Sequence, residues 1–216
     1  MPRTKGKEPL SQEKILLAAV KYADQNGIDK LNIRQLATLL NSGAMSLYYY
    51  FSSKGELLDA MVEFVAAQIE TPDPNATWRD GIARLAMSAH EAMGRHPWVC
   101  RIWSKQTLGP NRLAFMESVL RVLRQNGFSI ADAYEAYCAI TVHIEGSALQ
   151  AAEFPLKPKD YQRAAAAFLE SVDASAPIPY FIENVRYRME HADLPDQFTL
   201  VLDMILNGFE ARLAHK

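Results

Sequence analysis

Apolar residues recur at intervals of three and four along most of this chain, the spacing that gathers them on one face of an α-helix. The first such segment follows Ser11, a residue type that caps helices, and ends at Asn26–Gly27. Its predicted inner face consists of Ile15, Ala18, Ala19, Tyr22 and Ala23. We expect this helix to serve as scaffold.

Two short helices joined by a tight turn are predicted next, over residues 32–51. Asn32 can cap the first helix, with Gln35 as its capping-box partner. The run Asn41-Ser42-Gly43 then ends that helix, because Asn and Gly tolerate the left-handed backbone that such a turn needs. A second helix that restarts so soon crosses the first steeply, which is the helix-turn-helix arrangement.

The second short helix, over residues 44–51, is predicted to turn Leu47 and Phe51 into the core. Its side chains with at least partly outward faces are those of Ser46, Tyr48, Tyr49 and Tyr50. Three adjacent tyrosines on a helix without acidic residues are unusual for a segment that only packs a core. This helix is therefore the first candidate for a binding surface.

A fourth helix is predicted over residues 53–70, since Ser53 and Glu56 have the spacing of a capping box. Free backbone amides at its start favour an anion, and Lys54 adds a positive charge there. On general grounds a lysine at a helix start is a surface residue, because it opposes the helix dipole. A linker, residues 71–77, follows this helix.

Every segment after Thr77 has helical spacing, and none alternates with the period of a strand. The predicted helices cover residues 78–95, 97–105, 110–126, 130–153, 159–172, 179–191 and 196–215. We therefore predict an all-α fold with an N-terminal three-helix helix-turn-helix domain, residues 1–54. The connecting helix 53–70 leads to a C-terminal helical domain, residues 71–216.

Charge is distributed unevenly along the chain. Residues 1–54 hold eight Lys or Arg against four acids, whereas the rest holds 15 basic and 21 acidic residues. A positive head on a negative body orients a protein toward a polyanion head-first. Residues 1–9 carry three of these basic residues and are interpreted either as a disordered tail or as an arm that contacts DNA. The chain contains neither a signal peptide nor an apolar run long enough to span a membrane, which predicts a cytoplasmic protein.

The N-terminal quarter resembles the DNA-binding domain of the tetracycline-repressor (TetR) family. The residues that carry the resemblance are Gly27, Asn32, Leu36-Ala37, Leu47-Tyr48, Phe51, Lys54 and Glu56-Leu57. The resemblance implies that the second short helix enters the major groove of double-stranded operator DNA and that Lys54 contacts a phosphate. The implied DNA-binding residues are Asn32, Arg34, Gly43, Ala44, Met45, Ser46, Tyr48, Tyr49, Tyr50 and Lys54. Among these, base preference is expected to reside in Ala44, Met45, Tyr49 and Tyr50.

Two segments of the body favour a homodimer. Residues 130–153 are rich in Ala, Gly and Ser, which allow another helix to approach closely, and residues 196–215 carry a wide apolar stripe. Either both segments line the core of one chain, or they form a four-helix interface between two chains. The predicted interface residues are Tyr137, Thr141, Ala148, Leu202, Ile205 and Phe209.

The body also resembles the ligand-binding domain of the tetracycline-repressor subgroup, in Trp78-Arg-Asp-Gly, His96-Pro-Trp, Leu108-Gly-Pro and residues 202–210. This resemblance implies a cavity for a small-molecule effector. Its predicted lining is Met61, Phe64, Met87, His90, Trp98, Trp103, Phe115, Met116, His143 and Glu145. The histidines that help bind a metal-chelated drug in the type member have no clear counterpart, so we expect no metal and no cofactor.

Catalysis is the first rival to a binding function. The sequence has no Gly-x-Ser-x-Gly elbow, no Gly-rich phosphate loop and no His-Glu-x-x-His pair, and we predict that the protein is not an enzyme. The expected function is a dimeric repressor that a small molecule releases from its operator. Constitutive or architectural DNA binding and ligand-dependent activation remain as alternatives.

Overall fold

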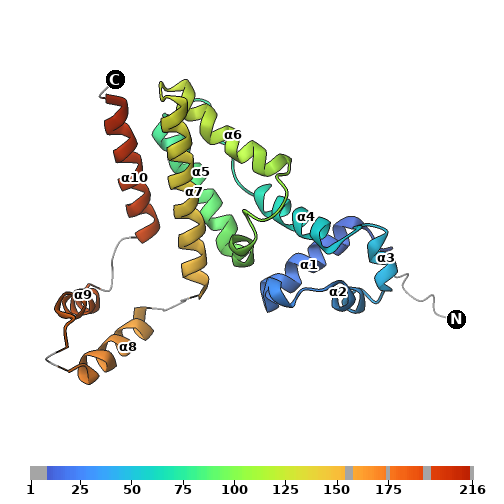
Figure 1. Cartoon of the computed structure of the whole chain (residues 1–216), viewed down its shortest axis with the longest axis horizontal. Helices are drawn as coiled ribbons and strands as arrows, with labels where there is room; N and C mark the ends of the chain where they lie inside the picture. The colour runs from blue at the N-terminus through green and yellow to red at the C-terminus, as the bar shows by residue number, and fades with distance from the viewer. Residues whose placement is uncertain (1–8, 154–157, 174–175, 192–195, 215–216) are drawn as a thin grey trace.

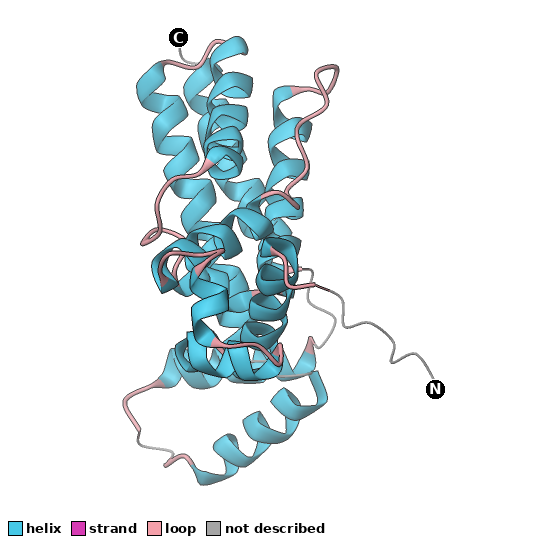
Figure 2. Ribbon diagram, turned by 90° about the vertical axis from the view of Figure 1, so that its right-hand side faces the viewer, coloured by secondary structure: helices cyan, strands magenta, loops and turns pink. Residues whose placement is uncertain are grey.

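The protein is described from a computed structural model that covers residues 9–153, 158–173, 176–191 and 196–214. Within these ranges the chain contains helices and no strand, as predicted (Figure 2). Residues 1–9, interpreted either as a disordered tail or as an arm that contacts DNA, fall almost wholly outside the described residues.

The head consists of α1 (Gln12–Asn26), a short 3-10 helix η1 (Ile28–Lys30), α2 (Ile33–Leu39) and α3 (Ala44–Tyr48). The Ser11 hydroxyl accepts a hydrogen bond from the backbone amide of Lys14 at 3.1 Å and so begins α1. Gly27 ends it at φ 83°, a left-handed value that glycine adopts without strain. Ile15, Leu36, Leu47 and Phe51 are all buried and hold α1, α2 and α3 together, as part of an apolar core that continues into the body.

The helix α4 (Lys54–Ala66) leads from the head to the body. The body begins with α5 (Trp78–Arg95) and the 3-10 helix η2 (Pro97–Arg101), followed by α6 (Pro110–Gln125) and α7 (Ile130–Glu153). The predicted helix over residues 97–105 is thus shorter and more tightly wound than expected. The long helix α7 packs along α5, α6 and η2, and α10 (Gln197–Ala214) packs on α7 and α5.

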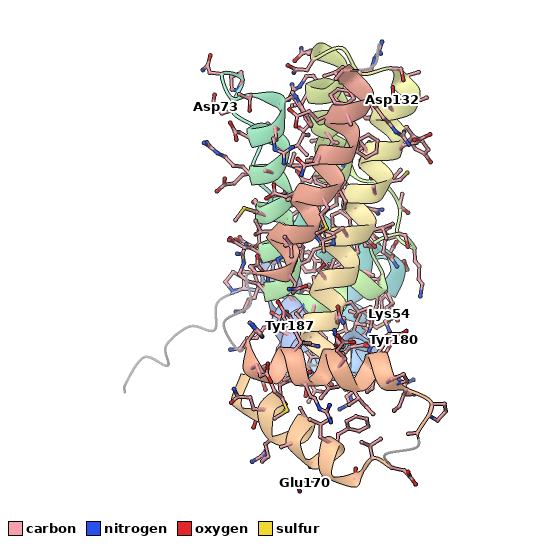
Figure 3. The ribbon with its side chains drawn as sticks, turned by 90° about the vertical axis from the view of Figure 1, so that its left-hand side faces the viewer. Lys54, Asp73, Asp132, Glu170, Tyr180 and Tyr187 are labelled. Carbon is pink, nitrogen blue, oxygen red and sulfur yellow. The ribbon has the colours of Figure 1, made fainter. Side chains whose placement is uncertain are left out.

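The helices α8 (Pro158–Ser171) and α9 (Pro179–Glu190) pack on each other and project from the body as an arm (Figure 1). An apolar hollow of about 280 Å³ lies between them, lined in part by Phe168, Phe181 and Val185. Exposed Tyr180 and Tyr187 lie on α9, which runs across the lower ends of α7 and α10 in Figure 3. Asp73 and Asp132 mark the opposite end of the body in that view.

Candidate nucleic-acid interface

The turn between α2 and α3 is a helix-ending motif built on Asn41. The backbone amide of Ser42 donates to the carbonyl of Ala37 at 2.9 Å, and the amide of Asn41 donates to the carbonyl of Thr38 at 3.0 Å. Asn41 takes the left-handed conformation, with φ 49°. The expectation that Gly43 also does so is wrong, because Gly43 is the extended N-cap of α3, with φ −83°.

The caps on either side of α3 fix its direction. The Asn32 side-chain oxygen accepts from the backbone amide of Gln35 at 2.9 Å, and its amide group donates to the Gln35 side chain at 2.6 Å. Ser53 accepts from the amide of Glu56, but the Glu56 carboxylate reaches Ser52 rather than Ser53, at 2.6 Å from both the Ser52 amide and hydroxyl. These bonds to Ser52 lower the pKa of Glu56.

The outward face of α3 presents Met45 and Tyr49, which are 81% and 85% exposed. Tyr48 and Ser46 are also exposed, and Arg34, Asn32, Gly43 and Lys54 lie exposed on the flanking segments. Ala44 is half-buried. The structure therefore gathers nine of the ten predicted DNA-binding residues around one short helix without an acidic side chain.

The tenth residue, Tyr50, behaves differently from the prediction. Its side chain is half-buried, and its hydroxyl donates a 2.7 Å hydrogen bond to the backbone carbonyl of Leu10. The ring also meets that of Tyr49 edge-on, with 5.2 Å between ring centroids. Because its hydroxyl is already bonded within the chain, Tyr50 supports the recognition surface from behind rather than extending it.

A cavity of about 160 Å³ lies where the end of α4 meets α5 and α6. Its lining consists of Ala66, Ala67, Ile69, Glu70, Thr71, Leu85, Asn111, Ala114, Phe115 and Ser118. Of the ten predicted effector residues, only Phe115 belongs to this lining. Met61, Trp98 and Trp103 are buried core residues, Phe64 and Met116 are half-buried, and Met87 is 42% exposed on α5.

The two predicted pocket histidines enclose a ring of α10. His90 stacks on Phe198 at 4.0 Å between centroids, and His143 stacks on its other side at 4.7 Å. The Nε2 of His143 donates to the carbonyl of Phe198 at 2.9 Å. Burial lowers the pKa of His90, opposed by the negative charge of Asp196. Both histidines therefore hold α10 against α5 and α7.

Two opposite charges lie inside the body. Arg112 is only 7% exposed and lies over the Trp103 ring at 5.0 Å, and its Nη1 donates to the carbonyl of Gln106 at 3.0 Å. Burial raises the pKa of the Glu145 carboxyl, and the charge of Arg112 opposes that rise. Burial, followed by the charge of Glu145, also raises the pKa of Tyr137. Glu145 as an effector contact stays a prediction.

A clamp between α4 and α6 was not predicted from the sequence. The Glu63 carboxylate accepts from the backbone amides of Asn111 and Arg112, at 2.7 and 3.3 Å, and so caps the start of α6. Asp59 accepts from the amide of Thr107 at 3.1 Å. A Cβ atom at Gly109 would lie 2.3 Å from the Glu63 carboxyl carbon, so a larger residue there would displace the carboxylate from this cap. Sequence separations of about fifty residues leave no local signal for such contacts.

A second unpredicted contact joins α1 to η2. The indole Nε1 of Trp98 donates to Asp24 at 2.6 Å, and Nδ1 of His96 lies 2.8 Å from the same oxygen. Arg101 adds ion pairs with Asp29 in the head and with Glu153 at the end of α7. The head is thus held to the body at two places, through α4 and beneath η2.

The predicted dimer residues are mostly internal. Thr141, Ala148, Leu202 and Phe209 are buried where α10 packs on α7 and α5, and Tyr137 and Ile205 are half-buried. The apolar stripe of the last helix is thus largely covered by its own chain, and the prediction that this stripe faces a second chain needs correction. On the same two helices, Val142 is 72% exposed and Met204 is 61% exposed.

An exposed recognition helix on a small head, coupled by α4 to an all-α body, defines the class of helix-turn-helix DNA-binding regulators. Residues 15–61 match the profile described as "Bacterial regulatory proteins, tetR family", and residues 71–213 match "Tetracyclin repressor-like, C-terminal domain". The chain belongs to the TetR family of transcriptional regulators.

Relatives and solved structures agree with this assignment. The chain is 32% identical to the HTH-type transcriptional repressor DrrR1 of Streptomyces coeruleorubidus, over 99% of this chain and 82% of that protein. It is 29% identical to the class D tetracycline repressor protein of Escherichia coli, over 94% and 91% of the two chains. ActR of Streptomyces coelicolor, solved in complex with (S)-DNPA, superimposes with a TM-score of 0.77 at 26% identity, covering 94% of this chain and 98% of ActR.

No helix in the described ranges is both long and apolar enough to cross a membrane. Nor do those residues include a group of three or more His, Cys, Asp or Glu side chains that could hold a metal ion.

Proposed function

We propose that this protein is a homodimeric repressor that binds operator DNA through α3 and leaves it when a small-molecule effector occupies the body. The observation that carries the proposal is the clamp of Glu63 on the start of α6. The same stretch of α6 lines the cavity, and α4 follows directly on the recognition helix. A ligand between α4, α5 and α6 therefore acts on a helix that moves the head.

This arrangement assigns a separate role to each part of the chain. Residues 1–54 bind DNA, the helix at 53–70 connects, and residues 71–216 bind the effector and the second chain. In the head, Arg34, Met45 and Tyr49 face the base edges, and Ser46, Tyr48 and Lys54 face phosphates. A dimer places two copies of α3 on half-sites one or more helical turns apart, each turn being about 34–36 Å. Such a protein works at the bacterial chromosome, and we assign it to the cytoplasm and to no enzymatic reaction.

Release requires that the effector favour one of two arrangements of the heads. In the arrangement described here, Glu63 holds the start of α6, Asp59 holds Thr107 in the segment before it, and Asp24 holds η2. An effector that enlarges the cavity pushes α4 and α6 apart, tilts α4 and changes the separation of the two recognition helices. The relative ActR was solved with a small molecule bound, which supports this mode of regulation.

The size of the cavity favours a second candidate, constitutive DNA binding. Ligand sites commonly have volumes of about 300–1,000 Å³, whereas this cavity has about 160 Å³. A body whose only role is dimerisation needs no larger cavity.

One experiment separates the two candidates. Sequences bound by the full-length protein are selected from random double-stranded DNA, and binding to the selected operator is then titrated against a panel of metabolites and antibiotics. We expect a two-fold symmetric operator and release by at least one class of compound. An operator from which no compound releases the protein favours constitutive binding, and the absence of any enriched sequence contradicts both candidates.

A further inference from the structure

Two large apolar side chains project from the recognition helix into solvent. Met45 and Tyr49 are 81% and 85% exposed and lie four residues apart. The backbone amide of Tyr49 donates to the carbonyl of Met45 at 3.3 Å, so the two residues follow each other on one face of the helix. Leu47, on the opposite face, is buried. Met45 and Tyr49 form an apolar pair, which we call the α3 pair.

The chemistry of α3 excludes the commonest ways of reading a base. Guanine is read by bidentate Arg or Lys, and adenine by bidentate Asn or Gln. The helix Ala44–Tyr48 and the following residues Tyr49 and Tyr50 contain none of these four side chains. What α3 offers to a major groove is hydroxyl groups and the apolar surface of the α3 pair.

The major groove has one apolar feature that distinguishes base pairs, the C5-methyl group of thymine. We propose that the α3 pair reads thymine methyl groups, and that each operator half-site therefore presents thymines opposite Met45 and Tyr49. This inference rests on the proposed function, since it names the bases that the same surface recognises.

The surroundings of the α3 pair fit a nucleic acid rather than a protein. Residues 31–55 contain no Asp or Glu, and within them Arg34 and Lys54 stand exposed on either side of α3. Of these two cations, Lys54 suits a phosphate at the rim of a groove, and Arg34 suits a base edge on its floor, beside the methyl groups that the α3 pair contacts. The net positive charge of the head adds to this complementarity.

The ring of Tyr49 is also contacted from one side before DNA arrives. It meets the Tyr50 ring edge-on at 5.2 Å, and Tyr50 is fixed by its hydrogen bond to Leu10. Because an ordered ring loses less conformational freedom on binding, the contact gains affinity. Tyr50 is therefore a positioning residue for the α3 pair.

The test replaces each thymine of the selected operator, one at a time, with deoxyuridine. Uracil keeps the pairing edge and the O4 acceptor and lacks only the methyl group. We expect the wild-type protein to bind about fourfold more weakly at each position where a methyl group is contacted, as burial of one carbon group implies. The measurement is the dissociation constant at fixed salt concentration.

Variants assign each effect to a side chain. Met45→Ala and Tyr49→Ala each abolish the response to uracil at one set of positions, whereas Met45→Leu retains it because leucine is also apolar. Leu113→Ala, a change at an exposed leucine of the body, keeps the wild-type response at every position. Because Met45 and Tyr49 are exposed, these changes leave the fold intact, which circular dichroism verifies.

An operator that is bound with unchanged affinity after every uracil substitution overturns this inference and leaves the proposed function standing. An equal loss in wild type and in both alanine variants overturns it as well, since another residue then contacts the methyl groups. Failure to select any operator instead contradicts the proposed function.

Discussion

The three tyrosines that follow Leu47 differ in what their side chains do. Tyr49 is almost fully exposed, Tyr48 is partly exposed, and Tyr50 is tied to Leu10. The sequence predicted outward faces for all three because they lie on a short helix with Leu47 and Phe51 as its core side. It could not predict the bond of Tyr50, since Leu10 lies forty residues away and is brought near only by tertiary packing.

This difference gives a stability test. Tyr50→Phe removes the hydroxyl and leaves the Leu10 carbonyl without its donor, which should lower the free energy of unfolding by about 1 kcal/mol. Tyr49→Phe removes an exposed hydroxyl with no described hydrogen bond and serves as the matched control, with an expected change below about 0.5 kcal/mol. Urea denaturation measures both. Equal values for the two variants would show that the Tyr50 bond contributes nothing.

Lys54 has a separate role at the residue scale. It is exposed at the first position of α4, where free backbone amides also point outward. Lys54→Ala should weaken binding to all DNA sequences alike and reduce the slope of log affinity against log salt by about one. Lys105→Ala, in the body, should leave the slope unchanged. A slope that stays at the wild-type value in Lys54→Ala removes this lysine from the phosphate contacts.

At the scale of elements, the clamp of Glu63 on α6 makes a prediction about Gly109. Gly109→Ala places a methyl group against the Glu63 carboxylate and forces it away from the amides of Asn111 and Arg112. The loss of this cap should cost about 1 kcal/mol of stability. It should also weaken the effect of any effector on DNA binding, because a displacement of α6 is then no longer transmitted to α4 through the Glu63 carboxylate.

The matched control is Gly94→Ala on α5, where a Cβ atom meets nothing within 4 Å. There we expect unchanged or slightly increased stability, since alanine favours a helix. Thermal unfolding gives the stability of each variant, and an operator-release titration gives its response to effector. If Gly109→Ala retains both wild-type stability and wild-type release, the clamp does not transmit the signal.

Helix boundaries were predictable because caps are local. The segments 78–95 and 130–153 match α5 and α7 as observed, and Pro110 begins α6 as predicted.

The periodicity of apolar residues also predicted which helix faces are buried, but not which helix covers each of them. The stripe that includes Leu202 and Phe209 was expected to meet a second chain and instead packs largely inside its own, because α10 folds back on α7 and α5. The spacing of apolar residues along a helix does not indicate which other helix will cover them.

At the scale of the whole molecule, the surface for a second chain is expected on the exposed sides of α7 and α10. Val142 and Met204 project there, and Gly146 and Gly208 lie exposed on the same helices, which allows helices to approach closely. The projecting arm of α8 and α9, with exposed Tyr180 and Tyr187, adds further apolar surface. A four-helix interface from two chains fits this distribution.

Met204→Lys should therefore yield monomers by light scattering and weaken operator binding at least about tenfold, because one head alone contacts a single half-site. Leu113→Lys, on exposed α6 surface, should leave the dimer intact. Phe209→Lys should instead unfold the body, because it buries a charge inside one chain. A dimeric Met204→Lys protein would place the interface elsewhere.

The clamp has a consequence for hybrid regulators. Because Glu63 lies on α4 and its partners lie at the start of α6, the connecting helix α4 belongs to the head and to the body alike. A chimera that joins this head and α4 to the body of a relative inherits the carboxylate. The acquired body must then offer a glycine where Gly109 stands, and grafts made without that match should still bind operator DNA but fail to respond to the new effector.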